Sequence, residues 1–225
     1  MSVLQNFIVF EGGDGSGTST QLELLKRRFG KEDALSPPVI FTFEPTDGAV
    51  GRLLRAALRG EPRLHGETMT RLFSADRAEH LYGEGGIVEA AERGSLVICD
   101  RYTLSSRVYQ GLECGDGLPA ALNGGFPAPE LLLFFDIDPR LALLRLETRT
   151  QKDVYESLDF QLRVRERYLG LLDSCRAEGS RVVVIDASAP IDAVAEAVWQ
   201  NISLLPVMPR QRGSCIASSM KKAIN

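Results

Sequence analysis

The sequence predicts an α/β fold in which a doubly wound sheet of about five parallel strands carries helices on both faces. Five short apolar runs, at 6–11, 38–44, 95–100, 131–138 and 181–186, lack the strict alternation of half-exposed strands. They therefore suit strands that are buried on both faces. Segments with helical spacing separate the runs, and the ligand site of such a sheet lies at the carboxyl ends of its strands.

The segments between the apolar runs have the spacing of amphipathic helices. Helices are expected at 20–29, 50–58, 67–84, 139–149, about 153–178 and 191–202. A Gly- and Pro-rich stretch at 113–130 is expected to be a surface connection. Residues 1–205 should form a single domain with a small helical lid at about 143–157, and residues 206–225 a basic, poorly ordered tail.

The composition narrows the class of protein. With 44% hydrophobic and 25% charged residues and a mean hydropathy of -0.06, the chain is typical of a globular domain. A net charge of -4 argues against a broad basic surface for nucleic acid. The sequence lacks a signal-peptide pattern, an apolar run of roughly 20 residues and a C-x-x-C pair. We therefore expect a cytoplasmic protein with free thiols and with neither nucleic acid nor a membrane as partner.

Residues 10–21 read FEGGDGSGTSTQ, a degenerate form of the phosphate-binding pattern G-x-x-x-x-G-K-[S/T]. A glycine-rich turn between a strand and a helix aims backbone N–H groups at one point, where the helix dipole also favours an anion. Thr18 stands where the pattern has lysine, and Ser19 where it has the magnesium-ligating hydroxyl. The alternative is a tight turn without a ligand. The candidate ATP and phosphate site comprises Gly12, Gly13, Gly15, Ser16, Gly17, Thr18, Ser19 and Thr20.

A second candidate element, CDRYTLSSRVYQG at 99–111, includes the end of the third apolar run. Asp100 ends that run, a position from which a carboxylate reaches Mg²⁺ or its waters. Arg101 offers a planar fork for phosphate oxygens. If the following residues are helical, Arg101 and Ser105 share one face. The alternative is an Asp–Arg pair that only caps the helix.

Two helical segments carry side chains that suit a nucleoside. Ser106, Tyr109 and Gln110 would share a helix face that could read a sugar and a base. Phe73 and Arg77, four residues apart in LFSADRAEH, place a ring and a guanidinium on one face, where they could stack a base and bond its rim. The alternative for this second pair is a buried Phe beside a surface Arg.

The segment LLRLETRTQKDVYES at 143–157 carries cations at helical spacing. Arg145, Arg149 and Lys152 would lie roughly one turn apart if the segment is helical. The alternative is a solvated surface stripe. A lid that closes over ATP is nevertheless where a substitute for the missing loop lysine would have to come from.

Together these elements resemble thymidylate kinase, the family that transfers the γ-phosphoryl group of ATP to dTMP. The resemblance runs from about residue 6 to about residue 200. It rests on FEG-x-DG-x-G, the EP turn, LFSADRAEH, DRYTLSSRVYQG, FPAPELLLFFDID, the arginine-bearing lid and RERYLGLL. It implies a P-loop NTPase-like fold, ATP and dTMP as substrates, Mg²⁺ as cofactor, and a homodimer.

The resemblance also implies roles for matching residues. Asp14 would meet the deoxyribose 3′-hydroxyl, Arg101 would grip the dTMP phosphate, and Asp100 with Ser19 would organise Mg²⁺. Around the nucleoside, Phe73 would stack on thymine, Arg77 would bond a thymine carbonyl, and Tyr109 would crowd the 2′ position. The rest of the acceptor site comprises Glu44, Pro45, Ser106 and Gln110.

The sequence departs from the family pattern twice. Thr18 replaces the loop lysine, and residues 43–48 read FEPTDG where many members have Arg-Glu-Pro-Gly-Gly-Thr. We hypothesise an active kinase whose cation has moved to the lid, because a decayed loop would not be expected to keep the other parts. The catalytic set is then Asp14, Arg101, Arg145 and Arg149. The alternatives are a kinase for another deoxynucleotide such as dUMP, and a catalytically silent nucleotide-binding sensor or partner protein.

Overall fold

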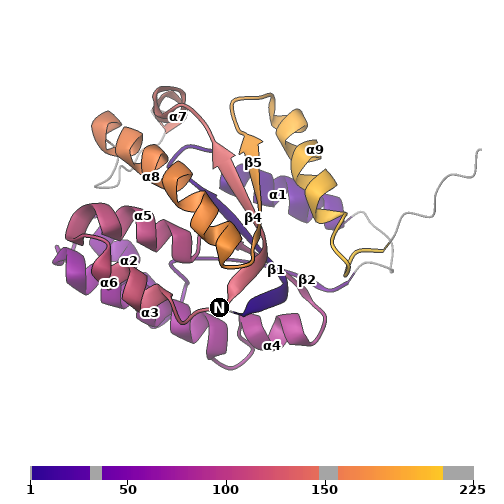
Figure 1. Ribbon diagram of the computed structural model, residues 1–225, viewed down its shortest axis with the longest axis horizontal. Coiled ribbons are helices and arrows are strands. Elements are labelled where there is room, and N and C mark those ends of the chain that lie inside the picture. The colour runs from indigo at the N-terminus through magenta and orange to yellow at the C-terminus, as the bar shows by residue number, and fades with distance from the viewer. Residues whose placement is uncertain (1, 31–36, 147–156, 210–225) are drawn as a thin grey trace, which may run out of the picture.

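The computed structural model describes residues 2–30, 37–146 and 157–209 of the chain. Its centre is a five-stranded parallel sheet in the order β2-β3-β1-β4-β5 (Figure 1). The strands are β1 Val3–Gly12, β2 Val39–Phe43, β3 Leu96–Asp100, β4 Ala128–Asp136 and β5 Arg181–Asp186. The predicted parallel sheet is confirmed, and each strand overlaps one of the five apolar runs.

Helices cover both faces of the sheet and follow the strands in sequence (Figure 1). They are α1 Thr18–Phe29, α2 Ala49–Leu58, α3 Gly66–Tyr82, α4 Ile87–Glu92, α5 Thr103–Cys114, α6 Gly117–Asn123, α7 Pro139–Leu146, α8 Leu158–Ala177 and α9 Ile191–Ile202. The strand-and-helix alternation read from the sequence thus gives the doubly wound arrangement.

Burial on both faces explains why the strands are continuously apolar. Ile8 and Phe10 of β1 pack in the layer with α1 and α9, whereas Phe7 and Val9 pack in the layer with α4. Leu132 of β4 lies beside Val9 in register and packs against α5 and α8. The sheet therefore has two hydrophobic cores, one on each side, as parallel sheets require.

The sequence does not predict two short helices. One is α4, and the other is α6, which lies within the stretch expected to be a surface connection. That expectation is wrong in part, because Asn123 at the end of α6 is 3% exposed and Phe126 is 9% exposed. Asn123 is buried because its amide oxygen accepts a hydrogen bond from Arg77 of α3.

The packed core extends past the domain boundary expected at residue 205. Leu205 and Met208 pack into the same core as α1 and α9, so the domain reaches at least Met208. The expected tail from 210 onward and residues 147–156 of the expected lid lie outside the described residues. Within the described ranges, no helix is long and apolar enough to cross a membrane.

The turn after β2 is held by contacts with α2 and α3. The Thr46 backbone N–H and hydroxyl donate to the two carboxylate oxygens of Asp76, at 2.7 and 2.6 Å. α2 then packs so closely on the turn that a Cβ at Gly51 would lie 2.0 Å from the Thr46 carbonyl oxygen. Glu44 and Pro45 directly precede Thr46. Their position therefore depends on residue 51 being a glycine.

Replacing Gly51 with alanine should destabilise the protein by about 1–3 kcal/mol, because the methyl group forces α2 away from the turn. The matched control is Gly170→Ala in α8, where an added Cβ meets no atom within 4 Å. That change should stabilise the protein by about 0.5–1 kcal/mol through helix propensity. Urea denaturation compares the two variants, and a Gly51→Ala protein as stable as wild type would contradict the packing argument.

Candidate active site

The glycine-rich loop joins the end of β1 to the start of α1. At Gly15 the backbone φ is +78°, and a Cβ there would lie 2.5 Å from the Ala142 carbonyl oxygen, so the loop can approach α7 only with glycine. The N-terminus of α1 follows directly at Thr18, which is 9% exposed. The geometry suits an anion held by backbone N–H groups and the helix dipole. Thr18 contributes a hydroxyl group but no charge.

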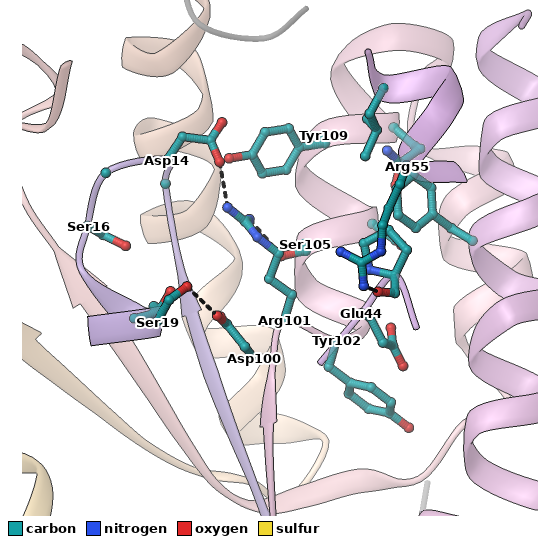
Figure 2. Close-up of a pocket in the computed structure, with 18 of the residues that line it drawn as sticks. Asp14, Ser16, Ser19, Glu44, Arg55, Asp100, Arg101, Tyr102, Ser105 and Tyr109 are labelled. Atoms are coloured by element: carbon teal, nitrogen blue, oxygen red, sulfur yellow. Dashed lines mark hydrogen bonds and ion pairs between the residues drawn. The ribbon is translucent and has the colours of Figure 1, made fainter. Parts of the chain in front are cut away.

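Ser19 and Asp100 form an oxygen-rich pair beside this loop. Because Phe10 of β1 lies opposite Asp100 of β3, the end of β3 lies beside the loop that leads from β1 to Ser19 in α1. Ser19 Oγ donates to Asp100 Oδ2 at 3.0 Å (Figure 2). Asp100 Oδ1 is buried and accepts no hydrogen bond from the residues that the structure describes. A free hard oxygen next to a hydroxyl fits Mg²⁺, so Ser19 and Asp100 are the residues that would hold it.

Arg101 reaches the loop from the neighbouring strand. Its guanidinium donates to Asp14 Oδ1 at 2.5 Å and to the Gly12 carbonyl oxygen at 3.2 Å (Figure 2). Gln161 of α8 donates to the other Asp14 oxygen at 2.8 Å. Arg101 also donates to Ser105 Oγ at 3.3 Å, but it precedes α5 and has a backbone φ of +68°, so the two residues meet without sharing a helix face. A cation is thereby fixed at the mouth of the phosphate loop.

A single cavity of about 670 Å³ joins the loop to a pocket between α2, α3 and α5. Most of the predicted site residues line it: Gly13, Asp14, Gly15, Ser16, Gly17, Thr18, Ser19, Thr20, Glu44, Pro45, Phe73, Arg77, Asp100, Arg101, Ser106, Tyr109 and Gln110. The phosphate loop and the predicted base-reading residues therefore belong to one continuous site. Its volume is in the range of small-molecule and cofactor pockets.

Three predicted site residues are not in the wall of this cavity as described. Gly12 touches the site through its carbonyl oxygen, which accepts from Arg101. Arg145, near the end of α7, donates to the Ala187 carbonyl oxygen at 3.1 Å. Arg149 lies outside the described residues. The lid as a source of cations therefore stays a prediction.

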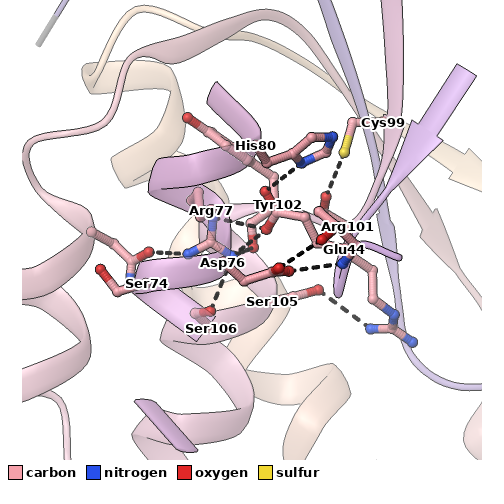
Figure 3. Close-up of polar contacts among 12 residues, drawn as sticks. Glu44, Ser74, Asp76, Arg77, His80, Cys99, Arg101, Tyr102, Ser105 and Ser106 are labelled. Carbon is pink, nitrogen blue, oxygen red and sulfur yellow. Dashed lines mark hydrogen bonds and ion pairs between the residues drawn. The ribbon is translucent and has the colours of Figure 1, made fainter. Parts of the chain in front are cut away.

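Arg77 is not a surface residue, contrary to the plainer reading of its helix. Its side chain and that of Glu44 are 1% and 2% exposed, and Nη2 lies 2.6 Å from Glu44 Oε2. Nη1 donates to Asn123 Oδ1. Nη2 also donates to the Tyr102 carbonyl oxygen and to Ser106 Oγ (Figure 3). The pocket thus has a buried, fully oriented guanidinium at its base end. Such a group can donate to a base rim without first losing conformational entropy.

Sequence reasoning missed two cations of the pocket wall. Arg55 of α2 and Arg59, the C-cap residue of this helix, line the cavity. Arg55 donates to the Pro45 carbonyl oxygen and lies 4.9 Å over the Phe43 ring. Their spacing of four residues after the EP turn could have predicted that both side chains face the site, because residues four apart share a helix face. These arginines add positive charge around the acceptor pocket.

The fold and this site define a P-loop phosphotransferase that acts on a nucleotide. A phosphate loop opens onto a strand-end carboxylate, and the same cavity holds an aromatic ring and a buried guanidinium. The sequence pattern of the thymidylate kinase family matches residues 10–198. The chain therefore belongs to the thymidylate kinase family, and it is an enzyme of the phosphotransferase class.

Individual relatives agree with this assignment. A Treponema pallidum protein described as a thymidylate kinase is 39% identical over 206 residues, which cover 90% of this chain and 97% of the relative. A Geobacillus thymidylate kinase is 34% identical over 201 residues, covering 84% and 91% of the two chains. The similarity thus spans nearly the whole of each relative.

The buried Glu44–Arg77 pair predicts a large stability loss on removing one charge. Glu44→Gln keeps the side-chain size but leaves Arg77 buried without a carboxylate, so the free energy of unfolding should fall by about 3–5 kcal/mol. Glu67→Gln is the matched control in the same helix as Arg77. Glu67 pairs with Arg71 on the surface, with 53% and 56% of the side chains exposed, and should lose at most about 1 kcal/mol. Equal losses in urea denaturation would contradict the assigned burial.

Proposed function

We propose that the protein transfers the γ-phosphoryl group of ATP to dTMP by in-line displacement, giving ADP and dTDP. The observation that carries the proposal is the single cavity with a phosphate loop on one wall and a base-reading pocket on the other. Arg101 lies between these walls, since it contacts Asp14 of the loop and lies 5.3 Å over the Tyr109 ring. A donor phosphate and an acceptor phosphate would therefore meet at this guanidinium.

On the donor side, the loop from Gly12 to Thr20 would cradle the ATP phosphates with backbone N–H groups. Mg²⁺ held by Ser19 and Asp100 would neutralise charge on the β- and γ-phosphates. A dTMP phosphate oxygen attacks the γ-phosphorus while the bond to the β-phosphate oxygen breaks. Little covalent chemistry is left to the protein, so positioning and charge compensation supply the rate.

On the acceptor side, the pocket fits thymine and deoxyribose. Phe73 stacks on the base, and Arg77 donates to a thymine carbonyl while Ser106 and Gln110 bond nearby. Tyr109 would crowd the 2′ position of the sugar and so favour deoxyribose. The set is completed by Glu44, which pairs with Arg77, by Pro45 beside it, and by Asp14, which would receive the 3′-hydroxyl when dTMP binds.

Thr18 removes a cation that the transferring phosphate would otherwise meet. A lost charge-assisted hydrogen bond costs roughly 1.5–3 kcal/mol, or about a 10- to 200-fold loss in rate if nothing compensates. Arg101 already touches the loop, and a lid that carries Arg145 and Arg149 can add a second guanidinium at the β- and γ-phosphates. The effect of a cation on the rate depends on its position relative to the phosphates and not on the element that carries it.

Alanine substitutions test the lid. Arg145→Ala and Arg149→Ala should each lower kcat by more than about threefold, because a transition-state contact is lost. The control is Arg140→Ala in the same helix as Arg145, whose partner is the half-exposed Asp138. If neither lid change lowers turnover by about threefold, the lid does not replace the lysine.

A coupled assay of ADP release tests the substrate. With Mg-ATP, dTMP should give the highest kcat/KM, ahead of dUMP by about 10- to 200-fold, the usual discrimination for one methyl group. A reaction without acceptor is the background, and dCMP tests the base edge. Preference for dUMP would establish the related kinase. ATP binding without turnover on any acceptor would establish the silent nucleotide-binding protein.

We also propose that the enzyme is a cytoplasmic homodimer. The homodimer rests on the family alone. Cys99, Cys114 and Cys175 are free thiols, as suits a reducing compartment. Sedimentation equilibrium of the full chain tests the dimer, and a mass of one chain at micromolar concentration would exclude it.

A further inference from the structure

Glu11 is a buried carboxylate directly before the phosphate loop. It has no exposed surface, although it is an acid on the central strand β1. Oε1 accepts from the backbone N–H groups of Tyr102 and Ser105, at 2.9 and 3.2 Å. Oε2 accepts from Ser105 Oγ at 2.6 Å and from the Tyr168 hydroxyl at 3.1 Å. A buried charge with this many donors is placed for its geometry, because burial itself is costly.

The first pair of bonds fixes the start of α5. Tyr102 is the N-cap residue of α5 and provides no side-chain cap, so the Glu11 carboxylate satisfies N–H groups that a helix start leaves unpaired. The residue before it, Arg101, has a backbone φ of +68°, which is strained for a side chain of this size. The Arg101 backbone is held there by the neighbouring bonds, including its own N–H to the Phe10 carbonyl oxygen at 2.8 Å.

The second pair of bonds fixes the Arg101 side chain. Ser105 Oγ donates its proton to Glu11, which leaves its lone pairs for the Arg101 guanidinium at 3.3 Å. The hydroxyl of Tyr168, a residue of α8, lies 2.8 Å from Ser105 Oγ. Figure 3 shows Ser105 directed at Arg101, and Figure 2 shows Arg101 directed at Asp14. A continuous chain of polar contacts thus runs from Glu11 to the phosphate loop.

We propose that Glu11 is a positioning residue for Arg101 in phosphoryl transfer. It acts through the α5 N-terminus and through Ser105, and it touches neither nucleotide itself. The proposal rests on the proposed function, because it needs Arg101 to meet the phosphates. Burial raises the pKa of Glu11, while the bond from Ser105 and the charge of Arg101 lower it. Since Thr18 supplies no charge, the placement of Arg101 matters more here than in a loop that has a lysine.

The test uses the full chain and separates kinetics from stability. Glu11→Gln removes the charge and turns one oxygen acceptor into a donor, and Ser105→Ala removes the link to Arg101. Each should lower kcat/KM for dTMP by about tenfold or more, with KM for ATP changed less than about twofold. The double variant should be little worse than either single one, because both act along one path. Glu130→Gln is the matched control, since Glu130 also accepts a backbone N–H, that of Asn6, but lies far from the loop along β4.

The reference variant Arg101→Lys distinguishes the possible failures. If Arg101→Lys lowers kcat/KM for dTMP while Glu11→Gln and Ser105→Ala stay within about twofold of wild type, the positioning role is overturned. If Arg101→Lys has no effect either, the role of Arg101 in the proposed function fails and the positioning role fails with it. Should Glu11→Gln not fold, Ser105→Ala and Tyr168→Phe carry the test. An equal kinetic effect of Glu130→Gln would mark a general loss of packing and would also overturn the proposal.

Discussion

The active site depends on the parallel pairing of β1 with β3. Phe10 lies opposite Asp100, and the Arg101 N–H donates to the Phe10 carbonyl oxygen at 2.8 Å. A shift of one residue would move Ile8 and Phe10 into the layer that Phe7 and Val9 fill, and the reverse, so packing in both layers would be lost. The register set by hydrophobic packing thereby also sets the distances among the phosphate loop, the strand-end carboxylate and the arginine. Core formation and site formation are the same event in this region.

The polar part of the site is built from buried and partly buried charges that satisfy one another. Arg77 is held by Glu44, and Arg101 is held by Asp14 and, through Ser105, by Glu11. Pairs of this kind contribute little net stability because desolvation offsets the attraction. Their value lies in orientation: a guanidinium with fixed partners presents its free N–H groups in one direction. These charges therefore contribute little to stability but hold the site in the arrangement that phosphoryl transfer needs.

The sequence contains the local features of the fold but not its long-range partners. The five strands, the glycine-rich loop and the Asp100–Arg101 pair were predictable, since each depends on residues adjacent in the chain. The burial of Arg77 was not, because it requires Glu44 from 33 positions away and Asn123 from 46 positions away. α6 was not predicted for the same reason. Its Gly- and Pro-rich sequence is typical of a loop, and the contact that buries its last residue, the bond from Arg77 to Asn123, is long-range. The resemblance to a family supplied residue roles that spacing alone left open.

Residue 18 and residues 46–48 depart from the family pattern, and both departures change the contacts around the phosphate site. Without a lysine, α1 begins with a nearly buried threonine, and the loop is contacted by the guanidinium of Arg101, which lies between β3 and α5. Without the two glycines of the usual turn, Thr46 donates twice to Asp76, which fixes the turn to α3. In the described residues, the loop is contacted by Arg101 from outside it, and the turn is contacted by Asp76 of α3. Charge compensation tolerates a cation from outside the loop, because its effect depends on the position of the charge relative to the phosphates and not on its origin in the chain.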